Sequence, residues 1–397
     1  MKNLGEKVVI LSAVRTPIGK YGGAFKEISA VALGVAASVE AMKRAGVSPG
    51  QIDEVIFGMA RQAGNRPNPA RQVLYRSRIP IERPAFTVNK ACASGMKAIA
   101  LGCQSLLLGE NKIVLAGGTE NMSRIPYLLD GARWGYRLGD GVLVDAMYRD
   151  GLFCPLAEMI MGETVDLMAE KLGISRREQD EYALESQMKA KRAAEKLKFK
   201  DEIVPVAVRG KGGQESLISD DEHPRPETSF ENLATLQPAF RKGGSVTAGN
   251  SSGLTDGAAA LVLTTQSEAQ KLGARPLAEI LGFASAGVEP KEMGLGPVPA
   301  TKKILKSLNL SLADFDLIEI NEAFATQVLA CERELNWDKA KRNIKGGAIA
   351  LGHPIGCTGA RITVTLLHNL IQENKELGLA TLCVSGGQGM SLVLKRL

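Results

Sequence analysis

The sequence predicts an α/β protein built from two similar halves, with a segment inserted between them. Apolar, β-branched runs alternate with runs at helical spacing, and this alternation is typical of a parallel sheet with helices on its faces. The order of elements near the N-terminus recurs in the C-terminal part of the chain. Between the two parts, a Gly- and Pro-rich segment interrupts the alternation, which indicates an insertion.

The elements of the first half follow from their apolar patterns and from the residues that end them. Ser29 is the expected N-cap of a helix over 30–44 that stops at Gly46, and Gly109 is expected to end a helix over 94–108. Ser175 and Glu178 form an expected capping box before a long charged helix that reaches about residue 198. Strands are predicted over residues 8–14, 53–58, 85–88, 112–118 and 257–265, and a helix over 71–78.

The internal repeat consists of four matched blocks. Residues 43–53 resemble residues 306–316, an offset of 306 − 43 = 263, and residues 55–60 then correspond to 318–323. The helix after Cys92 has a counterpart after Gly359, and Met122 with Ser123 corresponds to Met390 with Ser391, an offset of 390 − 122 = 268. We therefore expect an N-terminal half formed by residues 1–118 and 250–275, an inserted loop domain over 119–249, and a C-terminal half over 276–397.

Composition excludes several classes of function. The chain of 397 residues is 45% hydrophobic and 23% charged, which is ordinary for a globular protein. A formal charge of +6 with only 5% aromatic residues argues against nucleic-acid binding but suits an anionic small ligand. Six cysteines without a C-x-x-C pair and three histidines without an H-E-x-x-H motif make a metal site improbable. Scattered cysteines, and the lack of a leader or membrane span, favour a cytoplasmic protein.

Cys92 lies where a predicted strand meets a predicted helix, in the stretch VNKACASGMKA. Free N–H groups and the positive end of the helix dipole favour the thiolate, which is the nucleophilic form of cysteine. The alternative is a buried cysteine that packs as a small hydrophobic residue.

Three C-terminal stretches place polar groups at the ends of buried strands or in Gly-rich loops, where open α/β sheets bind ligands. They contain Asn321, His353 and Cys383. Each alone is compatible with a structural role, namely capping for Asn321, loop bracing for His353 and packing for Cys383. Together with Cys92 they form a compact set for nucleophilic and acid–base chemistry. Cys103, Cys331 and Cys357 are assigned to packing, Cys154 to a free thiol, and His223 and His368 to no catalytic position.

Five ordered motifs resemble the thiolase family: VNKACASGMKA, TAGNSSGLTDGAAA, NEAFA, GGAIALGHPIGCTGARI and CVSGGQG. The resemblance covers essentially the whole chain. It implies a five-layered αβαβα core built from two halves with an inserted loop domain. It also implies an acyltransferase that works as a homodimer or homotetramer on acyl-CoA thioesters, with no metal or redox cofactor and with coenzyme A as substrate and product.

By the same resemblance, Cys92 is the acylated nucleophile, His353 takes its proton, and Cys383 removes a proton from the second acetyl-CoA. His353 and a water on Asn321 would stabilise one oxyanion, and the backbone N–H groups of Cys92 and Ser385 the other. The resemblance further assigns Arg225 to a CoA phosphate, Ser252 and Ala248 to the pantetheine, and four apolar residues to the tunnel wall: Leu152, Met161, Phe240 and Phe324.

The sequence departs from the family pattern at three places. Met159 and Ile160 replace a Tyr-His pair that is common in short-chain biosynthetic members, which makes the expected tunnel more apolar and leaves longer substrates possible. Ser385 stands where Gly is usual, so a backbone angle that requires Gly would be strained. Lys345 replaces Asn close to the His353 loop, and the sequence assigns it no role.

The expected activity is the reversible Claisen condensation of two acetyl-CoA to acetoacetyl-CoA and CoA. One alternative is a 3-ketoacyl-CoA thiolase that acts on longer chains in fatty-acid β-oxidation. A non-catalytic acyl-CoA- or lipid-binding relative is a second alternative, against which the complete set of Cys92, His353, Cys383 and Asn321 argues. A decarboxylating ketoacyl synthase would lack a cysteine at position 383.

Overall fold

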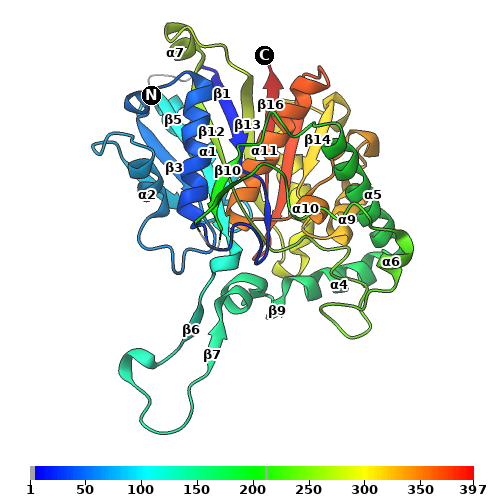
Figure 1. Ribbon diagram of the computed structural model, residues 1–397. Coiled ribbons are helices and arrows are strands. Elements are labelled where there is room, and N and C mark those ends of the chain that lie inside the picture. Colours follow the sequence, from blue (N-terminus) through cyan, green and yellow to red (C-terminus); the bar gives the residue numbers. More distant parts are fainter. Residues whose placement is uncertain (1–4, 211–212) are drawn as a thin grey trace.

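In the computed structural model, residues 5–210 and 213–397 are described, and they include one ten-stranded sheet with two halves. The strand order is β14-β15-β16-β13-β1-β12-β5-β3-β4, with β2 paired to β12 (Figure 1). The halves meet where β1 pairs with β13 at only two positions. The first half contains β1 (Val8–Arg15), β2 (Gly19–Lys20), β3 (Glu54–Gly58), β4 (Ala85–Val88), β5 (Ile113–Asn121) and β12 (Thr255–Thr265); the second contains β13 (Ala278–Gly287), β14 (Leu317–Ile320), β15 (Leu377–Val384) and β16 (Gln388–Arg396).

The sheet is mixed, so the expectation of a parallel sheet was wrong for most strand pairs. Only β4–β3–β5 and β14–β15 are parallel, and the pairs that connect them are antiparallel. The reason for β15 and β16 is local. A short turn containing Gly386 and Gly387, both at φ 81°, joins the two strands, and a short turn can connect only antiparallel neighbours. The alternating pattern predicted the elements but not their directions.

Helices form three layers around the two halves of the sheet, which gives the expected five-layered αβαβα core. The middle layer consists of α3 (Ser94–Leu108) and α11 (Ile355–Gln372), whose apolar residues share one core with strands of both halves. The outer layers are α1 (Ala30–Ala45) with α2 (Pro69–Arg76) on the first half, and α8 (Pro297–Leu308) with α9 (Ala325–Leu335) on the second. Short helices α7 (Gln266–Lys271) and α10 (Ala348–Leu351) complete this core.

Strand β12 shows how sequence alternation serves two layers at once. Ala259, Leu261 and Leu263 face the middle helices, while Ala258, Ala260 and Val262 face the outer helices. Side chains along a strand point to opposite faces in turn, so a strand covered on both sides has to be apolar throughout.

Two glycines allow α3 and α11 to cross at close range. A Cβ atom on Gly95 would lie 2.7 Å from the backbone nitrogen of Ala360, and one on Gly359 would lie 2.5 Å from the nitrogen of Met96. No side chain fits at either position. This contact brings the N-terminal ends of the two central helices together, and these ends carry the loops that contain Cys92 and His353.

Helix α3 also passes a length and hydropathy test for a membrane span, over Ala91–Leu108 with mean hydropathy 1.3. Two-thirds of this window is buried (67%), because α3 lies in the middle layer of the core. Its apolar composition is therefore explained by the protein interior.

The segment between β5 and β12 forms a separate set of small elements (Figure 1). A hairpin of β6 (Tyr127–Leu129) and β7 (Leu143–Asp145) projects from the body. Helix α5 (Arg176–Glu195) begins at the expected capping box, in which Ser175 Oγ accepts from the Glu178 N–H. Helix α5 ends at Glu195, three residues before the expected end. The remaining elements are a π-helix (Tyr148–Leu152), β8 (Phe153–Cys154), β9 (Met159–Ile160), α4 (Met161–Leu172), α5 (Arg176–Glu195), β10 (Val206–Arg209), β11 (Glu215–Ile218) and α6 (Phe230–Ala234).

Strand pairing corrects one block of the internal repeat. Val55 of β3 lies opposite Leu115 of β5, and Ile318, the counterpart of Val55, lies opposite Leu379 of β15. The strands β5 and β15 therefore correspond with an offset of 379 − 115 = 264. The predicted offset of 268 was wrong, because Met390 belongs to the next strand, β16.

Candidate active site

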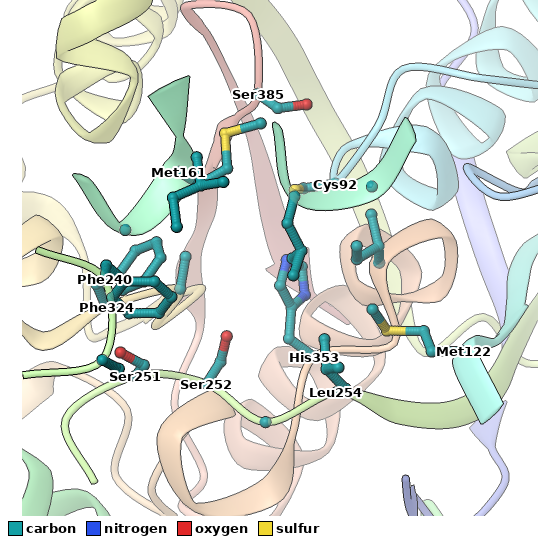
Figure 2. A pocket seen from close by; sticks show the side chains of 18 of the residues that line it. Cys92, Met122, Met161, Phe240, Ser251, Ser252, Leu254, Phe324, His353 and Ser385 are labelled. Atoms are coloured by element: carbon teal, nitrogen blue, oxygen red, sulfur yellow. The ribbon is translucent and has the colours of Figure 1, made fainter. Parts of the chain in front are cut away.

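A cavity of about 330 Å³ lies between the sheet ends and the inserted segment (Figure 2). Residues at or just after the C-terminal ends of β5 and β15 contribute to its wall. So do residues at or just before the N-terminal ends of α3 and α11. Eleven of the twelve predicted site residues line it: Cys92, His353, Cys383, Ser385, Arg225, Ser252, Ala248, Leu152, Met161, Phe240 and Phe324. Asn321 is the exception, since it is fully buried and is not part of the lining.

Cys92 sits in a tight turn between β4 and α3 that polar side chains hold in place. Ala91 has φ 44°, which is rare for a residue other than glycine. Asn89 Oδ1 accepts from the Ala91 N–H at 2.9 Å, and Ser94 Oγ accepts from the Lys90 N–H at 2.9 Å while donating to the Ala91 carbonyl at 2.7 Å. These bonds fix the unusual turn, so the half-buried Cys92 side chain is directed into the cavity.

The electrostatic environment of Cys92 differs from the sequence expectation. Burial raises the pKa of the Cys92 thiol, whereas the Arg61 charge and the backbone N–H groups of Ser385 and Cys92 act in the opposite direction. Burial prevails, because a thiolate loses water on entering an apolar pocket. The resting form favoured here is the neutral thiol, and the expectation of a stabilised thiolate was wrong for the free protein.

His353 lies in the loop before α11, and a residue of that helix holds its ring. Its Nδ1 lies 2.6 Å from Thr358 Oγ1, and that hydroxyl donates its single proton to the Pro354 carbonyl at 3.0 Å. With the hydroxyl proton given to the Pro354 carbonyl, we assign the hydrogen of the His353 bond to Nδ1, which leaves the lone pair on Nε2. Burial, with the charges of Arg361 and Arg61, lowers the pKa of His353 to about 3.

Cys383 lies near the end of β15 and Ser385 in the turn that follows it, and both line the cavity. Cys383 is 1% exposed, and burial raises the pKa of its thiol well above the ordinary value, with the neighbouring Cys92 adding to the shift. Ser385 is absent from the described non-glycine residues with positive φ, so the backbone strain considered for this Gly-to-Ser difference does not arise. The left-handed positions are taken by Gly386 and Gly387 instead.

Two buried carboxylates that the sequence analysis missed hold the loops around the cavity. Glu322 accepts from Tyr182 Oη (2.9 Å), Ser186 Oγ (2.7 Å), Asn343 Nδ2 (2.7 Å) and the Ile349 N–H (3.1 Å). It thereby fixes the segment that leads to His353. Its position beside Asn321, at the end of a buried strand, was the available signal.

Glu120, at the end of β5, joins the first half to the start of α11. It accepts from the backbone N–H groups of Ala60 (3.0 Å) and Gly356 (2.9 Å) and from that of Arg61. Burial raises the pKa of Glu120 to about 6. No motif marks this residue, because its partners are backbone groups from distant parts of the chain.

Three of the residues assigned to the tunnel, Met161, Phe240 and Phe324, lie along one side of the Cys92–His353 pair (Figure 2), and Leu152 also lines the cavity. Phe240 and Phe324 pack edge to face with ring centroids 5.9 Å apart. Arg225 is exposed, and its N–H donates to Gln187 Oε1. His223, which was given no catalytic position, also lines the cavity, with Nδ1 2.8 Å from the Ala350 carbonyl.

The other two departures from the family pattern have distinct structural contexts. Ile160 lines the cavity, in keeping with the expected apolar wall. Lys345 lies outside it. Its buried Nζ donates to the Lys198 carbonyl at 2.8 Å and sits 5.4 Å from the centre of the Phe199 ring, so Lys345 ties the loop before His353 to the end of α5.

The side chain of Asn321 is buried, and its polar atoms have no hydrogen-bond partner among the described residues. Asn321 donates from its backbone N–H to the Thr381 carbonyl at 3.0 Å, but both polar atoms of its buried side chain lack a partner among the described residues. Buried amides normally have hydrogen-bond partners, so this pair of atoms is an open binding position. Within residues 5–210 and 213–397, no group of three or more His, Cys, Asp or Glu residues is arranged to hold a metal ion.

Comparison with known proteins agrees with this arrangement over the whole chain. Residues 8–267 match the family model of the thiolase N-terminal domain, and residues 274–396 match that of the C-terminal domain. The acetyl-CoA acetyltransferase of Escherichia coli (strain K12) is 51% identical over 390 residues, covering 98% of this chain and 99% of the relative. That of Pseudomonas aeruginosa is 49% identical over 391 residues, covering 98% and 100%.

Solved structures give the same result. The crystal structure of the Bacillus anthracis acetyl-CoA acetyltransferase matches with a TM-score of 0.97 and 47% identity, covering 99% of both chains. Human mitochondrial 3-ketoacyl-CoA thiolase matches with a TM-score of 0.96 and 42% identity, again over 99% of both chains. With two family models that together span nearly all of the sequence, and relatives at about half identity, this chain belongs to the thiolase family.

Proposed function

We propose that this thiolase is an acetyl-CoA C-acetyltransferase, which condenses two acetyl-CoA to acetoacetyl-CoA and CoA and also catalyses the reverse thiolysis. The observation that carries the proposal is the presence of two thiols and a neutral imidazole in the wall of one cavity. The acetyl-CoA acetyltransferases among the relatives support the same substrate. No redox change occurs in this reaction, and we propose that CoA is substrate and product and that no other cofactor is required.

In the first half-reaction, the Cys92 sulfur attacks the carbonyl carbon of acetyl-CoA while Nε2 of His353 accepts the thiol proton. Backbone N–H groups of Cys92 and Ser385 would stabilise the oxyanion. The carbon–sulfur bond to CoA then breaks, and the proton on His353 passes to the departing sulfur. The acetyl group is left as a thioester on Cys92, so its activation is retained without ATP.

In the second half-reaction, Cys383 removes a proton from the methyl carbon of the second acetyl-CoA. Burial raises the pKa of Cys383 well above the ordinary value, so its thiol would first pass its own proton to Nε2 of His353, and the thiolate formed in this way is a strong base. The enolate oxygen would be stabilised by His353 and by a water on the unpaired amide of Asn321. The enolate carbon attacks the acetyl group on Cys92, the Cys92 sulfur leaves and takes the proton held by His353, and Cys383 keeps the proton from the methyl carbon, so all three groups return to their resting forms.

Two substitutions test these roles separately. Cys92→Ala should not be acylated by acetyl-CoA, whereas Cys383→Ala should be acylated on Cys92 but should not condense. Mass spectrometry of the protein after mixing with acetyl-CoA, followed by an acetoacetyl-CoA assay, distinguishes the two. Normal condensation by Cys383→Ala would show that a group other than Cys383 removes the proton from the methyl carbon of the second acetyl-CoA.

A 3-ketoacyl-CoA thiolase for longer chains is the second candidate, and Ile160 favours it because it makes the cavity wall more apolar. The similarity to human mitochondrial 3-ketoacyl-CoA thiolase points in the same direction. Thiolysis rates for 3-ketoacyl-CoAs of increasing length decide between them. A maximum at four carbons supports the acetyl-CoA enzyme, and a maximum at eight or more supports the alternative and a role in fatty-acid metabolism.

We further propose that the protein is a homodimer or homotetramer in the cytoplasm. Strand β4 is an edge of the sheet, and open edges with their unpaired backbone groups favour pairing with another copy. The tip of the β6–β7 hairpin exposes Trp134 (88%) and Leu138 (97%), as expected of a contact surface. Light scattering coupled to size exclusion measures the assembly, and cell fractionation tests the location.

A further inference from the structure

The cavity continues past the catalytic pair into a compartment to which the proposed function assigns no ligand. In Figure 2, Met161, Phe240 and Phe324 lie on one side of Cys92 and His353, and Met122 and Leu254 lie on the other. The first side is the one proposed for the pantetheine arm of CoA. The second side, here called the acyl compartment, is where a chain attached to the Cys92 sulfur would extend.

The acyl compartment has apolar walls and a single charged residue. Met122 and Ile355 belong to a buried apolar cluster against which Cys92 and Leu254 pack. Gly151 lies beside Met147 of the same cluster, and Arg61 donates to the Gly151 carbonyl, so both also belong to this side of the cavity. A ligand pocket that is apolar apart from one or two polar groups uses those groups to select and orient its ligand.

Arg61 has donors that the protein does not use. Its Nη2 donates to the Gly151 carbonyl at 2.6 Å, while its buried Nε has no partner. Within residues 5–210 and 213–397 no carboxylate forms an ion pair with Arg61. Burial raises the pKa of Glu120 and the Arg61 charge lowers it in part, but the Glu120 oxygens already accept from three backbone N–H groups, including that of Arg61 itself.

Arg61 is half-buried in the cavity wall, where a bound anion would meet donors that the protein leaves free. Arg61 lines the same cavity as Cys92 and His353. It is fixed in place by the Gly151 bond and by the Glu120 bond to its own backbone. These features describe a rigid, unpaired donor group in the cavity that holds the nucleophile.

Building on the proposed function, we propose that Arg61 binds an anionic group at the far end of a short acyl chain, so that the protein also acts on CoA thioesters of 3-oxo dicarboxylic acids and favours them over neutral acyl chains of equal length. In thiolysis, the Cys92 sulfur would attack C3 and the C2–C3 bond would break. Acetyl-CoA leaves after C2 gains a proton, and the remaining acyl group, with its free carboxylate, stays on Cys92. The sulfur of a second CoA then takes that group and frees Cys92.

The test compares two substrates of equal length, the CoA thioester of 3-oxohexanedioic acid and 3-oxohexanoyl-CoA, which differ in a terminal carboxylate. In the unmodified protein we expect kcat/KM to be at least about tenfold higher for the dicarboxylic thioester than for 3-oxohexanoyl-CoA. A charge-assisted hydrogen bond between Arg61 and the terminal carboxylate would stabilise its transition state by enough to give this factor. Arg61→Met should bring this ratio to about one or below, and Arg61→Lys should lie between. A ratio within one protein cancels any general effect of Arg61 on Cys92.

Arg225→Met is the matched control, because it removes another cavity-lining arginine from the side proposed for CoA, which both substrates share. It should leave the ratio unchanged even where both rates fall. A ratio of one or less in the unmodified protein, or a ratio that Arg61→Met does not lower, overturns the inference. Acetoacetyl-CoA separates the two proposals: if it is cleaved while the ratio is one, only the role of Arg61 is wrong, and if none of the three substrates is cleaved, the proposed function is wrong.

Discussion

The hydrogen bond between Thr358 and His353 offers the sharpest test of how this site keeps a base ready. Thr358→Val replaces the hydroxyl by a methyl group of similar size and removes the acceptor that lies 2.6 Å from Nδ1. Because His353 is 7% exposed and Thr358 fully buried, water cannot easily replace that acceptor. The Nδ1–H then loses its partner, and the tautomer with a free Nε2 lone pair is no longer favoured.

The size of the effect follows from this geometry. A buried donor without an acceptor costs about 1–3 kcal/mol. Since each 1.36 kcal/mol corresponds to a factor of ten, the population of productive His353 should fall by about 5- to 150-fold. We expect this loss mainly in kcat for thiolysis and in the rate of Cys92 acylation, with little change in KM, because Thr358 does not line the cavity.

Thr363→Val is a matched control on the same helix. The Thr363 hydroxyl is equally buried and donates to the Gly359 carbonyl at 2.8 Å, in the same manner as Thr358 to Pro354, but it makes no contact with His353. Thr358→Ser should restore most of the rate. Stopped-flow acylation and steady-state thiolysis would refute the reasoning if Thr358→Val stayed within about twofold of the unmodified protein, or if Thr363→Val lost as much.

Two further predictions concern charge and stability. Because burial raises the pKa of Cys92 and the pKa of His353 lies at about 3, alkylation of the free enzyme by iodoacetamide should keep accelerating above about pH 9 and show no step near pH 6.5; a rate constant that levels off below pH 8 would contradict this. Lys345→Asn should lower the free energy of unfolding by about 0.5–1.5 kcal/mol in urea, since the Lys198 carbonyl loses one of its two donors and keeps only Gln372 Nε2. Lys196→Asn at an exposed position should change it little, and equal losses would argue against the buried contact.

Local signals in the sequence predicted local structure well. Ser29 and Gly46 bound α1 as expected, and Gly109 ends α3 in the left-handed conformation. These are effects of a few neighbouring residues, so no tertiary information is needed. The family motifs likewise pointed to Cys92, His353 and Cys383 before the cavity that contains them was known.

Features that depend on distant partners were not predictable in this way. Strand direction is one example, because an apolar run such as 278–287 does not show whether its neighbour runs parallel or antiparallel. Arg61 is another: in the sequence it is one arginine after a strand, and only the fold places it in the wall beside Cys92. Thr358 could have been found, since it lies in the first turn of the helix that follows His353.

The thiolate expectation failed for a physical reason that also bears on how the reaction proceeds. A helix N-terminus contributes only a modest stabilisation of an anion, whereas burial is the largest effect on the Cys92 thiol and raises its pKa. With both thiols and the imidazole neutral at rest, the cavity holds no charge on its reactive groups until substrate arrives. Proton transfer from Cys92 to His353 should therefore accompany attack on the thioester, when the developing charge moves onto an oxygen that backbone N–H groups can bind. The apolar pocket therefore keeps Cys92 and His353 neutral in the free protein. Their charges form only when a bound thioester places its carbonyl oxygen near the backbone N–H groups.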